Sequence, residues 1–160
     1  MRALVQRVTR ASVTVFPPGA DRAAASGVVT GAIEAGFVVL VGVHARDTRA
    51  EAAWLARKVA ALRICADESG RMNRSIVDTG GGILVVSQFT LYGDAARGNR
   101  PSFVEAALPG VAEPVYVEFL HALAHELGRR VETGTFGADM EVSLVNDGPV
   151  TLLVERLAPP

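Results

Sequence analysis

The residues best placed to do chemistry are Ser87, Gln88, Phe89 and Thr90, which close a segment that begins with the apolar run 83–86. Polar groups at the end of a buried strand must find hydrogen-bond partners, because an unsatisfied polar group in apolar surroundings costs free energy. Such groups often line a binding or catalytic site. The same pattern also fits a strand that simply emerges into solvent, and both interpretations stay open on these residues alone.

A second candidate is the segment 146–151, Asn-Asp-Gly-Pro-Val-Thr, which places the Gly148–Pro149 step between two apolar stretches. Glycine and proline together are typical of turns. Most X–Pro bonds are trans, and only about 5–6% are cis in folded proteins. From the residues alone we therefore predict a hairpin turn that joins two strands.

The other reactive side chains form no convincing site. Glu118, His121 and His125 have the spacing of a two-histidine, one-carboxylate metal site, but they lie opposite the apolar stripe of their predicted helix. A solvated helix face explains them better, so we predict no metal and no cofactor. Cys65 has no histidine near it in sequence, which favours a buried structural thiol. We interpret His44 as a loop residue.

The amino-acid composition excludes several classes of protein. A chain of 160 residues fits one domain, over 1–160, and 49% hydrophobic with 21% charged residues is typical of a globular protein. The formal net charge of −1 excludes a strongly basic nucleic-acid binder, so any RNA contact must use a local patch. The single cysteine excludes an internal disulfide, and no apolar run is long enough to span a membrane. These features predict a cytoplasmic protein without membrane contact.

Strands are predicted where short runs rich in valine, isoleucine or threonine lie between turn residues. They cover residues 2–16 (one bent strand or two), 37–43, 83–91, 140–145 and 150–155. Turns are predicted at 67–70 and 80–82, and a loop at 17–27. Because the strands outnumber the helices and are mostly joined by turns, the expected class is α+β.

Two main helices are predicted. The first covers residues 48–62 and is opened by a capping box of Thr48 and Glu51. The second begins at Pro114, since proline is favoured in a first helical turn, and it reaches Leu127 before Gly128.

Four segments together resemble the D-aminoacyl-tRNA deacylase family. They are MRALVQRVTRASVTV at the start, SQFTLYGD at 87–94, RPSF at 100–103 and FGADMEVSLVNDGPVT at 136–151. The resemblance extends over residues 1–156 in the expected order, and SQFTL with NDGPVT is a specific combination. The chain departs from the family pattern in the loop 17–27, where a tight hairpin is usual.

The resemblance implies an α+β fold with a mostly antiparallel or mixed, barrel-like sheet, which works as a homodimer with its site at the subunit interface. It also implies hydrolysis of the ester that joins a D-amino acid, or glycine mischarged on tRNA(Ala), to the terminal adenosine ribose of tRNA. This reaction is a chiral proofreading step in translation. The expected partner is the 3′ end of aminoacyl-tRNA, and no DNA is expected.

Roles for particular residues also follow from the resemblance. Segment 87–90 would be catalytic, with backbone N–H groups around the substrate carbonyl, Phe89 near the terminal adenosine and Thr90 beside the ester. The Gly148–Pro149 bond would be cis and would reach into the partner's pocket. There its carbonyls would accept hydrogen bonds from the substrate ammonium and exclude the side chain of an L-amino acid.

The residues themselves leave the mechanism open. No Ser-His-Asp arrangement can be assembled around Ser87 or Thr90, but an ester is an activated bond. A charge-stabilising hole with a positioned water or ribose hydroxyl can therefore be sufficient. The resemblance implies that the RNA 2′-hydroxyl assists and that Thr90 is at most a positioning group. The alternatives are an esterase with a side-chain nucleophile and a non-catalytic nucleic-acid-binding protein on the same scaffold.

Binding of tRNA by a chain of net charge −1 must depend on local arginines. Arg97 and Arg100 follow the SQFTLYGD segment and are the expected contacts, because arginine can hold a phosphate with two parallel hydrogen bonds. Two solvated loop charges are the alternative interpretation.

Overall fold

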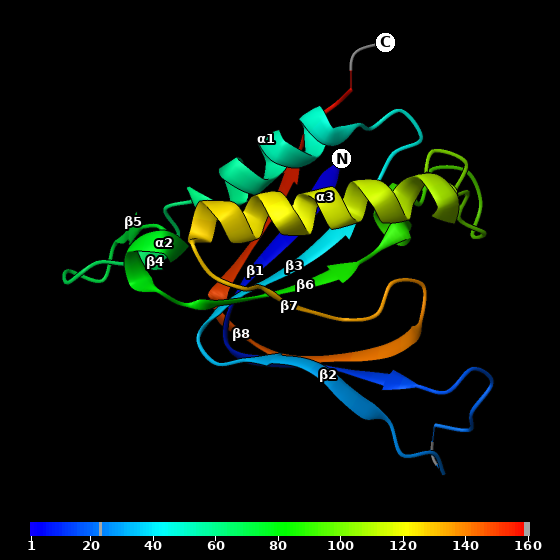
Figure 1. Ribbon diagram of the computed structural model, residues 1–160, viewed down its shortest axis with the longest axis horizontal. Helices are drawn as coiled ribbons and strands as arrows, with labels where there is room; N and C mark the ends of the chain where they lie inside the picture. Colours follow the sequence, from blue (N-terminus) through cyan, green and yellow to red (C-terminus); the bar gives the residue numbers. More distant parts are fainter. Residues whose placement is uncertain (23, 159–160) are drawn as a thin grey trace.

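The computed structural model describes residues 1–22 and 24–158 and confirms the α+β class. A six-stranded mixed sheet curls into a nearly closed barrel, and α1 (Arg49–Ala60) and α3 (Pro109–Leu127) lie together over one of its faces (Figure 1). The strand order is β2-β1-β3-β6-β7, and β8 pairs with the other edge of β1. The strands are β1 Arg2–Phe16, β2 Val28–Ile33, β3 Gly36–Gly42, β6 Gly82–Ser87, β7 Glu132–Thr133 and β8 Asp139–Glu155.

β1 is a single bent strand, the first of the two possibilities for residues 2–16. Its first half pairs with β3, from Arg2 opposite Gly42 to Val8 opposite Gly36, and its second half pairs with β2. β8 runs antiparallel along the opposite edge. The register shifts after Gln6, Val8 and Val13 are bulges, which bend a strand and increase its twist. This bend allows β3 and β2 to share one edge of β1.

The predicted hairpin in segment 146–151 is wrong, because β8 continues through it as one strand. Gln6 pairs with Thr151 and Val8 with Asn146, so residues 147–150 lie opposite a single residue of β1. β1 is long enough to pair with both apolar stretches, which therefore need not pair with each other. The Asn-Asp-Gly-Pro sequence forms a bulge within a strand.

The predictions for the neighbouring elements are confirmed in part. Segment 37–43 corresponds to β3, and α1 begins with the capping box that Thr48 and Glu51 form. The strand predicted at 83–91 ends earlier, at Ser87, and the chain then turns into a 3₁₀ helix, η1 (Phe89–Tyr92). The polar residues at this point interrupt the strand and do not extend it.

Helix α3 begins at Pro109 and not at Pro114, because Pro109 already occupies the first turn, where its missing N–H is not needed. Pro114 lies inside the helix and deprives the carbonyl of Gly110 of its usual N–H partner. Both residues are exposed, so water can satisfy that carbonyl.

Several short elements have no clear signal in the sequence. They are β2, β7, α2 (Ile76–Thr79), β4 (Cys65–Ala66) and β5 (Met72–Arg74). The predicted turns are present: the Gly70 amide donates to the Asp67 carbonyl between β4 and β5, and Gly80 ends α2 with a φ of 70°. Among the described residues, no helix combines the length and apolar character needed to cross a membrane.

The hydrophobic core has two parts, one on each face of the sheet. Between the sheet and the helices pack Val5, Phe37, Leu55, Phe119 and Leu123, which are fully buried. The second part fills the interior of the curled sheet and includes Val8, Val13, Val38, Leu84 and Val86.

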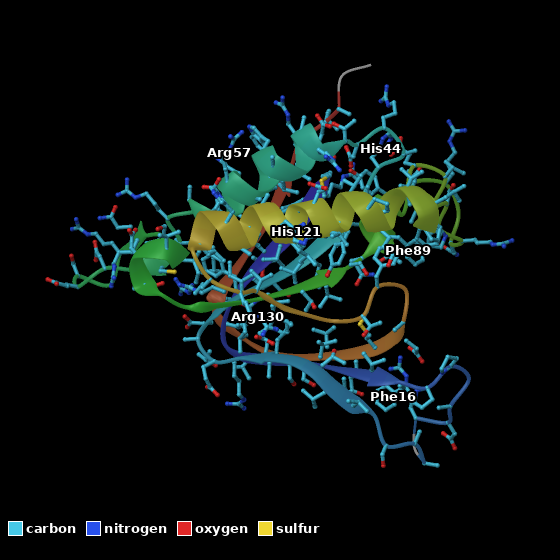
Figure 2. All side chains as sticks on the ribbon, in the orientation of Figure 1. Phe16, His44, Arg57, Phe89, His121 and Arg130 are labelled. Atoms are coloured by element: carbon cyan, nitrogen blue, oxygen red, sulfur yellow. The ribbon has the colours of Figure 1, made fainter. Side chains whose placement is uncertain are left out.

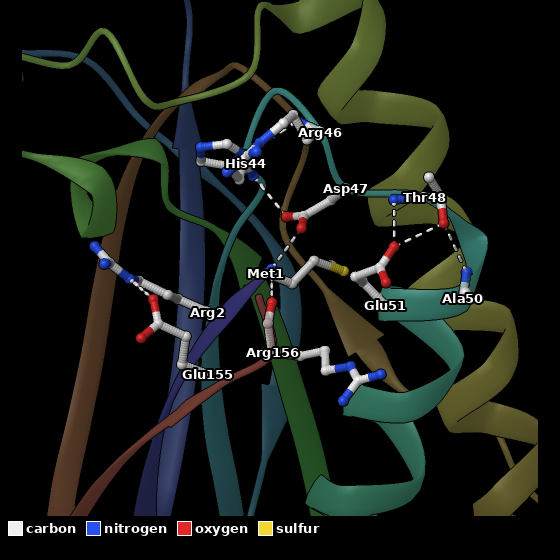
Figure 3. Close-up of polar contacts among 10 residues, drawn as sticks. All are labelled: Met1, Arg2, His44, Arg46, Asp47, Thr48, Ala50, Glu51, Glu155 and Arg156. Carbon is white, nitrogen blue, oxygen red and sulfur yellow. Dashed lines mark hydrogen bonds and ion pairs between the residues drawn. The ribbon is translucent and has the colours of Figure 1, made fainter. Parts of the chain in front are cut away.

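A buried polar cluster ties Met1, just before β1, to the loop before α1 and to the residue that follows β8 (Figure 3). The Met1 ammonium lies 2.7 Å from Asp47 Oδ1 and donates to the Arg156 carbonyl at 2.6 Å. The second carboxylate oxygen of Asp47 accepts the His44 amide at 2.7 Å. Because both charges are fully buried, the pair must remain intact for either to be tolerated there.

Candidate active site

A cavity of about 610 Å³ lies where β3 and β6 end, between the start of α3 and the segment that leads into β8. Ser87, Gln88 and Phe89 line one side of it, as their position after a buried strand suggested. The rest of its wall is mostly apolar and includes Phe103, Ala112, Tyr116, Phe136 and Met140. Cavities of this size and polarity are typical of small-molecule or cofactor sites.

Main-chain contacts hold η1 beside this cavity. The Gln88 amide donates to the Val41 carbonyl at 2.7 Å, which continues the β3–β6 ladder by one bond before the chain turns. η1 then packs directly on Gly42, where an added Cβ would lie 3.1 Å from the Gln88 carbonyl oxygen and 3.1 Å from Leu91 Cβ. A side chain at position 42 would therefore displace the turn.

The turn also presents main-chain donors. The first N–H groups of any helical turn have no acceptor within it, and in η1 these belong to Phe89 and Thr90. Gln88, the residue before the turn, makes no side-chain cap bond to them. Two adjacent N–H groups of this kind can stabilise negative charge on an oxygen atom.

No side chain in the cavity is placed as a general base. Among the described residues that line it, only Tyr116 and Asp139 are ionisable. Burial raises the pKa of Tyr116, whose hydroxyl donates to the Val85 carbonyl at 3.1 Å and so stays protonated. Asp139 forms an ion pair with Arg22. Both ionisable groups of the described lining are therefore engaged in contacts with other parts of the protein.

Thr90 is exposed and is not among the residues that line the cavity. The Gln88 side-chain amide donates to its hydroxyl oxygen. A nucleophilic hydroxyl needs a base that accepts its proton. An amide that donates to the hydroxyl offers no such acceptor, so this contact orients Thr90 without activating it.

Aromatic rings form two sides of the cavity. Phe89 and Phe103 pack edge to face with ring centroids 5.1 Å apart, and Tyr116 and Phe136 are tilted with centroids 5.7 Å apart. Phe89 remains exposed although it lines the cavity, and Figure 2 shows it at the open end of the sheet beyond α3. Such rings provide flat apolar surfaces on which a nucleobase can stack.

The Gly148–Pro149 step lies in the bulge of β8 and its peptide bond is cis. The bulge is fixed by the Arg7–Asp147 ion pair at 2.8 Å and by the Asn146 side chain, which accepts the Val150 amide at 3.1 Å. Gly148 and Pro149 are exposed.

Within one chain this bulge lies away from the segment 87–90. It is opposite Arg7 on β1, whereas Ser87 is in register, through Val41, with Ala3. Four residues along a strand correspond to about 13 Å, and three inter-strand spacings of about 4.8 Å add to that separation. Neither Gly148 nor Pro149 lines the cavity of its own chain.

Arg97 and Arg100 are exposed in a loop whose ends pair through Asp94 and Ser102. Ser102 is followed by Phe103, so the loop adjoins the aromatic wall of the cavity. The structure thus places the two ends of this loop beside η1 and the aromatic wall of the cavity.

The other sequence candidates lie elsewhere. His121 and His125 are exposed on α3, and Glu118 pairs with Arg49 at 3.1 Å. Cys65 is buried, and His44 packs against Tyr92 with ring centroids 5.5 Å apart.

Sequence reasoning missed the opposite wall of the cavity, formed by Tyr116, Phe136, Asp139 and Met140. These residues come from α3, a loop and β8. The only available signal was the FGADM segment at 136–140, which carries the resemblance but was given no role.

The sequence also matches known proteins over nearly its whole length. A family model described as D-Tyr-tRNA(Tyr) deacylase matches residues 4–155. The D-aminoacyl-tRNA deacylase of Chlorobaculum parvum is 53% identical over 155 residues, with 97% of each chain covered. That of Thermus aquaticus is 53% identical over 160 residues, which cover all of this chain and 98% of the relative.

Two solved structures are also similar. One, described as "c-Myc DNA Unwinding Element Binding Protein", has a TM-score of 0.86 at 41% identity and covers 99% of this chain and 100% of its own. The other, described as "Structural Analysis of a probable eukaryotic D-amino acid tRNA deacylase", has a TM-score of 0.77 over 96% of this chain and 97% of its own. At 17% identity the second shows the shared fold alone.

Arg2 links β1 to η1, and its removal should loosen the turn. Its guanidinium donates to the Leu91 carbonyl at 2.8 Å, lies 4.4 Å from the Tyr92 ring centroid and pairs with Glu155. We expect Arg2→Ala to lower the free energy of unfolding by about 1–2 kcal/mol. Amide exchange at Leu91 and Gly93, which donate within the turn, should accelerate.

Urea denaturation and hydrogen exchange measured by NMR check this expectation. Arg57→Ala, which removes an exposed arginine from α1, is the control and should change the stability by less than about 0.5 kcal/mol. Unchanged exchange at both amides in Arg2→Ala would mean that the turn is held without Arg2.

Proposed function

This chain belongs to the D-Tyr-tRNA(Tyr) deacylase family, and on that premise we propose that it hydrolyses the ester between a D-amino acid and the terminal adenosine of tRNA. The observation that carries the proposal is the juxtaposition of a nucleoside-sized aromatic cavity with the free amides of η1. The cavity suits an adenosine, and the η1 amides suit the carbonyl of an ester attached to that adenosine. The products are the free D-amino acid and tRNA.

The terminal adenosine would occupy the cavity, with its base between the Phe89 side and the Phe136 side. Both aromatic pairs support this placement, because base–ring stacking does not require a particular hydrogen-bond pattern. The ester would then lie at η1, where the amides of Phe89 and Thr90 face its carbonyl oxygen.

Catalysis would depend on the substrate's own hydroxyl. A water molecule adds to the carbonyl carbon, and the η1 amides stabilise the negative charge that develops on its oxygen. The bond to the ribose oxygen then breaks, and that oxygen takes up a proton. The absence of a placed base among the described cavity residues supports a role for the adjacent ribose 2′-hydroxyl in orienting the water.

Chiral selection would come from the Gly148–Pro149 carbonyls of a second subunit. The exposure of this bulge and its distance from the segment 87–90 of its own chain both support a homodimer with shared sites. The carbonyls would accept hydrogen bonds from the substrate ammonium. An L-amino acid presenting the same ammonium would direct its side chain into this rigid wall, and a selector of this kind discriminates by exclusion. Glycine has no side chain to exclude, so glycyl-tRNA(Ala) would also be hydrolysed.

Beyond the terminal adenosine, Arg97 and Arg100 would contact the tRNA backbone. Both residues are exposed in a loop whose ends adjoin the cavity wall, and this supports the role. We also propose a cytoplasmic location, because aminoacyl-tRNA is made and used there.

One observation favours a second candidate function, binding of nucleic acid without catalysis: the similar structure described as a DNA unwinding element binding protein. A protein of that kind would not need the segments SQFT and GPVT, which are both intact here. Deacylation assays therefore separate the two functions.

Chirality is the first test of the proposed function. We expect the purified protein to release D-tyrosine from D-Tyr-tRNA while L-Tyr-tRNA persists, with at least about a hundredfold difference in rate, equivalent to about 2.7 kcal/mol. Acid-precipitable radioactivity over time measures both reactions. Equal rates on the two enantiomers, or no release from either, would refute the proposal.

The role of the ribose hydroxyl is tested with the side chain of Thr90. Because the η1 amides remain in Thr90→Ala, this variant should keep activity within about tenfold of the original, whereas a substrate ending in 2′-deoxyadenosine should lose about a hundredfold or more. Single-turnover rates give both values. Loss of activity in Thr90→Ala with a normal rate on the deoxy substrate would instead identify Thr90 as the nucleophile.

Subunit complementation tests the shared site. Gly148→Ala/Pro149→Ala damages the selector, and Phe89→Pro removes a main-chain donor at a first helical position that tolerates proline. In a heterodimer of the two, one site carries both lesions and the other carries none. We expect D-selective activity to return to about half of the original rate per dimer.

Native mass spectrometry of differently tagged subunits verifies that heterodimers have formed, and each variant alone provides the control. If the heterodimers form and D-selective activity does not return, the selector acts within its own chain.

A further inference from the structure

We propose that Arg22, in the loop 17–27, is a positioning residue that neutralises Asp139 in the cavity wall and thereby allows the cavity to accept an adenosine that carries a phosphate. This inference rests on the proposed function, because it concerns the same cavity. It gives a role to the loop 17–27, which the proposed function does not otherwise use.

The contact between Arg22 and Asp139 is bidentate, with one guanidinium nitrogen on each carboxylate oxygen. Nε of Arg22 donates to one carboxylate oxygen of Asp139 at 3.3 Å, and Nη2 donates to the other. Nη2 also reaches the Met140 carbonyl at 3.4 Å. The guanidinium lies over the Phe16 ring, 5.2 Å from its centroid. Four contacts thus fix one side chain against the wall.

The pairing of β1 with β8 and the turn of the loop place Arg22 beside Asp139. Phe16, the last residue of β1, is directly paired with Asp139, the first residue of β8. The loop then turns back, with the Ala20 amide donating to the Pro17 carbonyl at 3.1 Å and the Ala25 amide donating to the Asp21 carbonyl at 2.7 Å. In Figure 2 Phe16 and Phe89 lie at the same end of the molecule, and the start of β8 passes between them.

Charge explains why this pair matters for binding. Asp139 is the only carboxylate among the described residues that line the cavity. The nucleotide that precedes the terminal adenosine is attached through an anionic phosphate, which an uncompensated carboxylate in the wall would repel. The apolar surroundings screen such repulsion less than bulk water does. Arg22 removes it by pairing with the carboxylate.

The pair contributes little to folding. The side chains of Arg22 and Asp139 are 44% and 50% exposed, and exposed ion pairs typically add less than about 1 kcal/mol. A change in phosphate binding without a change in stability is therefore the signature of the proposed role.

The experiment compares two small probes, adenosine and adenosine 5′-monophosphate, whose binding is followed by NMR shifts of the cavity amides. In Arg22→Ala we expect the Kd for the monophosphate to rise about fivefold, while the Kd for adenosine changes by less than about twofold. Asp139→Asn leaves the arginine unpaired, so the monophosphate should bind about twofold more tightly. Arg22→Ala/Asp139→Asn should return close to the original value, because neither charge remains.

Two further variants and two further measurements, deacylation kinetics and thermal melting, complete the design. Arg22→Lys keeps the charge without the bidentate contact and should bind the monophosphate within about twofold of the original. Arg57→Ala makes the same change in net charge on α1 and should leave both Kd values and the deacylation rate unchanged. With D-aminoacyl-tRNA, Arg22→Ala should raise KM with kcat retained, and its melting temperature should stay within about 3 °C.

The inference would be overturned by equal weakening of both probes in Arg22→Ala, by failure of the double substitution to restore binding, or by binding of neither probe to the original protein. Weaker binding in Asp139→Asn would also overturn it, since the carboxylate would then contact the ligand itself. If the probes behave as expected and no aminoacyl-tRNA is hydrolysed, the proposed function fails and the charge pair stands. If deacylation is normal and the Kd values of both probes are unchanged in Arg22→Ala, the proposed function stands and the inference about Arg22 fails.

Discussion

Pairing along β1 is the constraint on which the rest of this protein depends. One strand pairs with β3 and β2 on one edge and with β8 on the other, so its register fixes the positions of segments from both ends of the chain. Its side chains and its two ends also organise the site. Arg2 holds η1, Arg7 holds the bulge of β8, and Phe16 lies beneath the arginine that pairs with the cavity wall. A slip of one residue would move all three and would turn the buried face of β1 toward solvent.

The fold also requires the backbone of β3 to approach β6 and η1 closely. β3 and β6 meet at Gly36 and Gly82, where a Cβ on Gly36 would lie 1.9 Å from the Gly82 carbonyl oxygen. Gly42, at the other end of β3, leaves the space that η1 occupies. β3, whose residues are almost all buried, thus has glycine at both ends, one for the sheet and one for the site. In the proposed mechanism the functional groups are main-chain amides, and such a site would need no catalytic triad in the sequence.

Some short sequence patterns were sufficient to predict the strand or helix start in which they lie. The apolar run 37–43 and the Thr48–Glu51 pair are sufficient to place β3 and the start of α1. Two prolines fit a helix start equally well, and a Gly-Pro step fits a hairpin as well as a bulge. Only the length of β1 and the packing of α3 decide between these possibilities. Polar residues at the end of a buried strand indicated segment 87–90, and its first three residues line the cavity. The facing wall comes from three separate elements, and Arg22 reaches it from a loop, so no short pattern connects them.

The amides at the start of η1 also determine how this site tolerates genetic change. A main-chain N–H belongs to every amino acid except proline, so most substitutions at positions 89 and 90 keep the donor as long as the turn forms. A threonine codon becomes a proline codon by one nucleotide change, whereas a phenylalanine codon needs two. Single-nucleotide variation can therefore delete the amide of Thr90 directly, and it reaches the amide of Phe89 only through an intermediate codon. Drift in the side chains of this turn is compatible with an unchanged arrangement of donors.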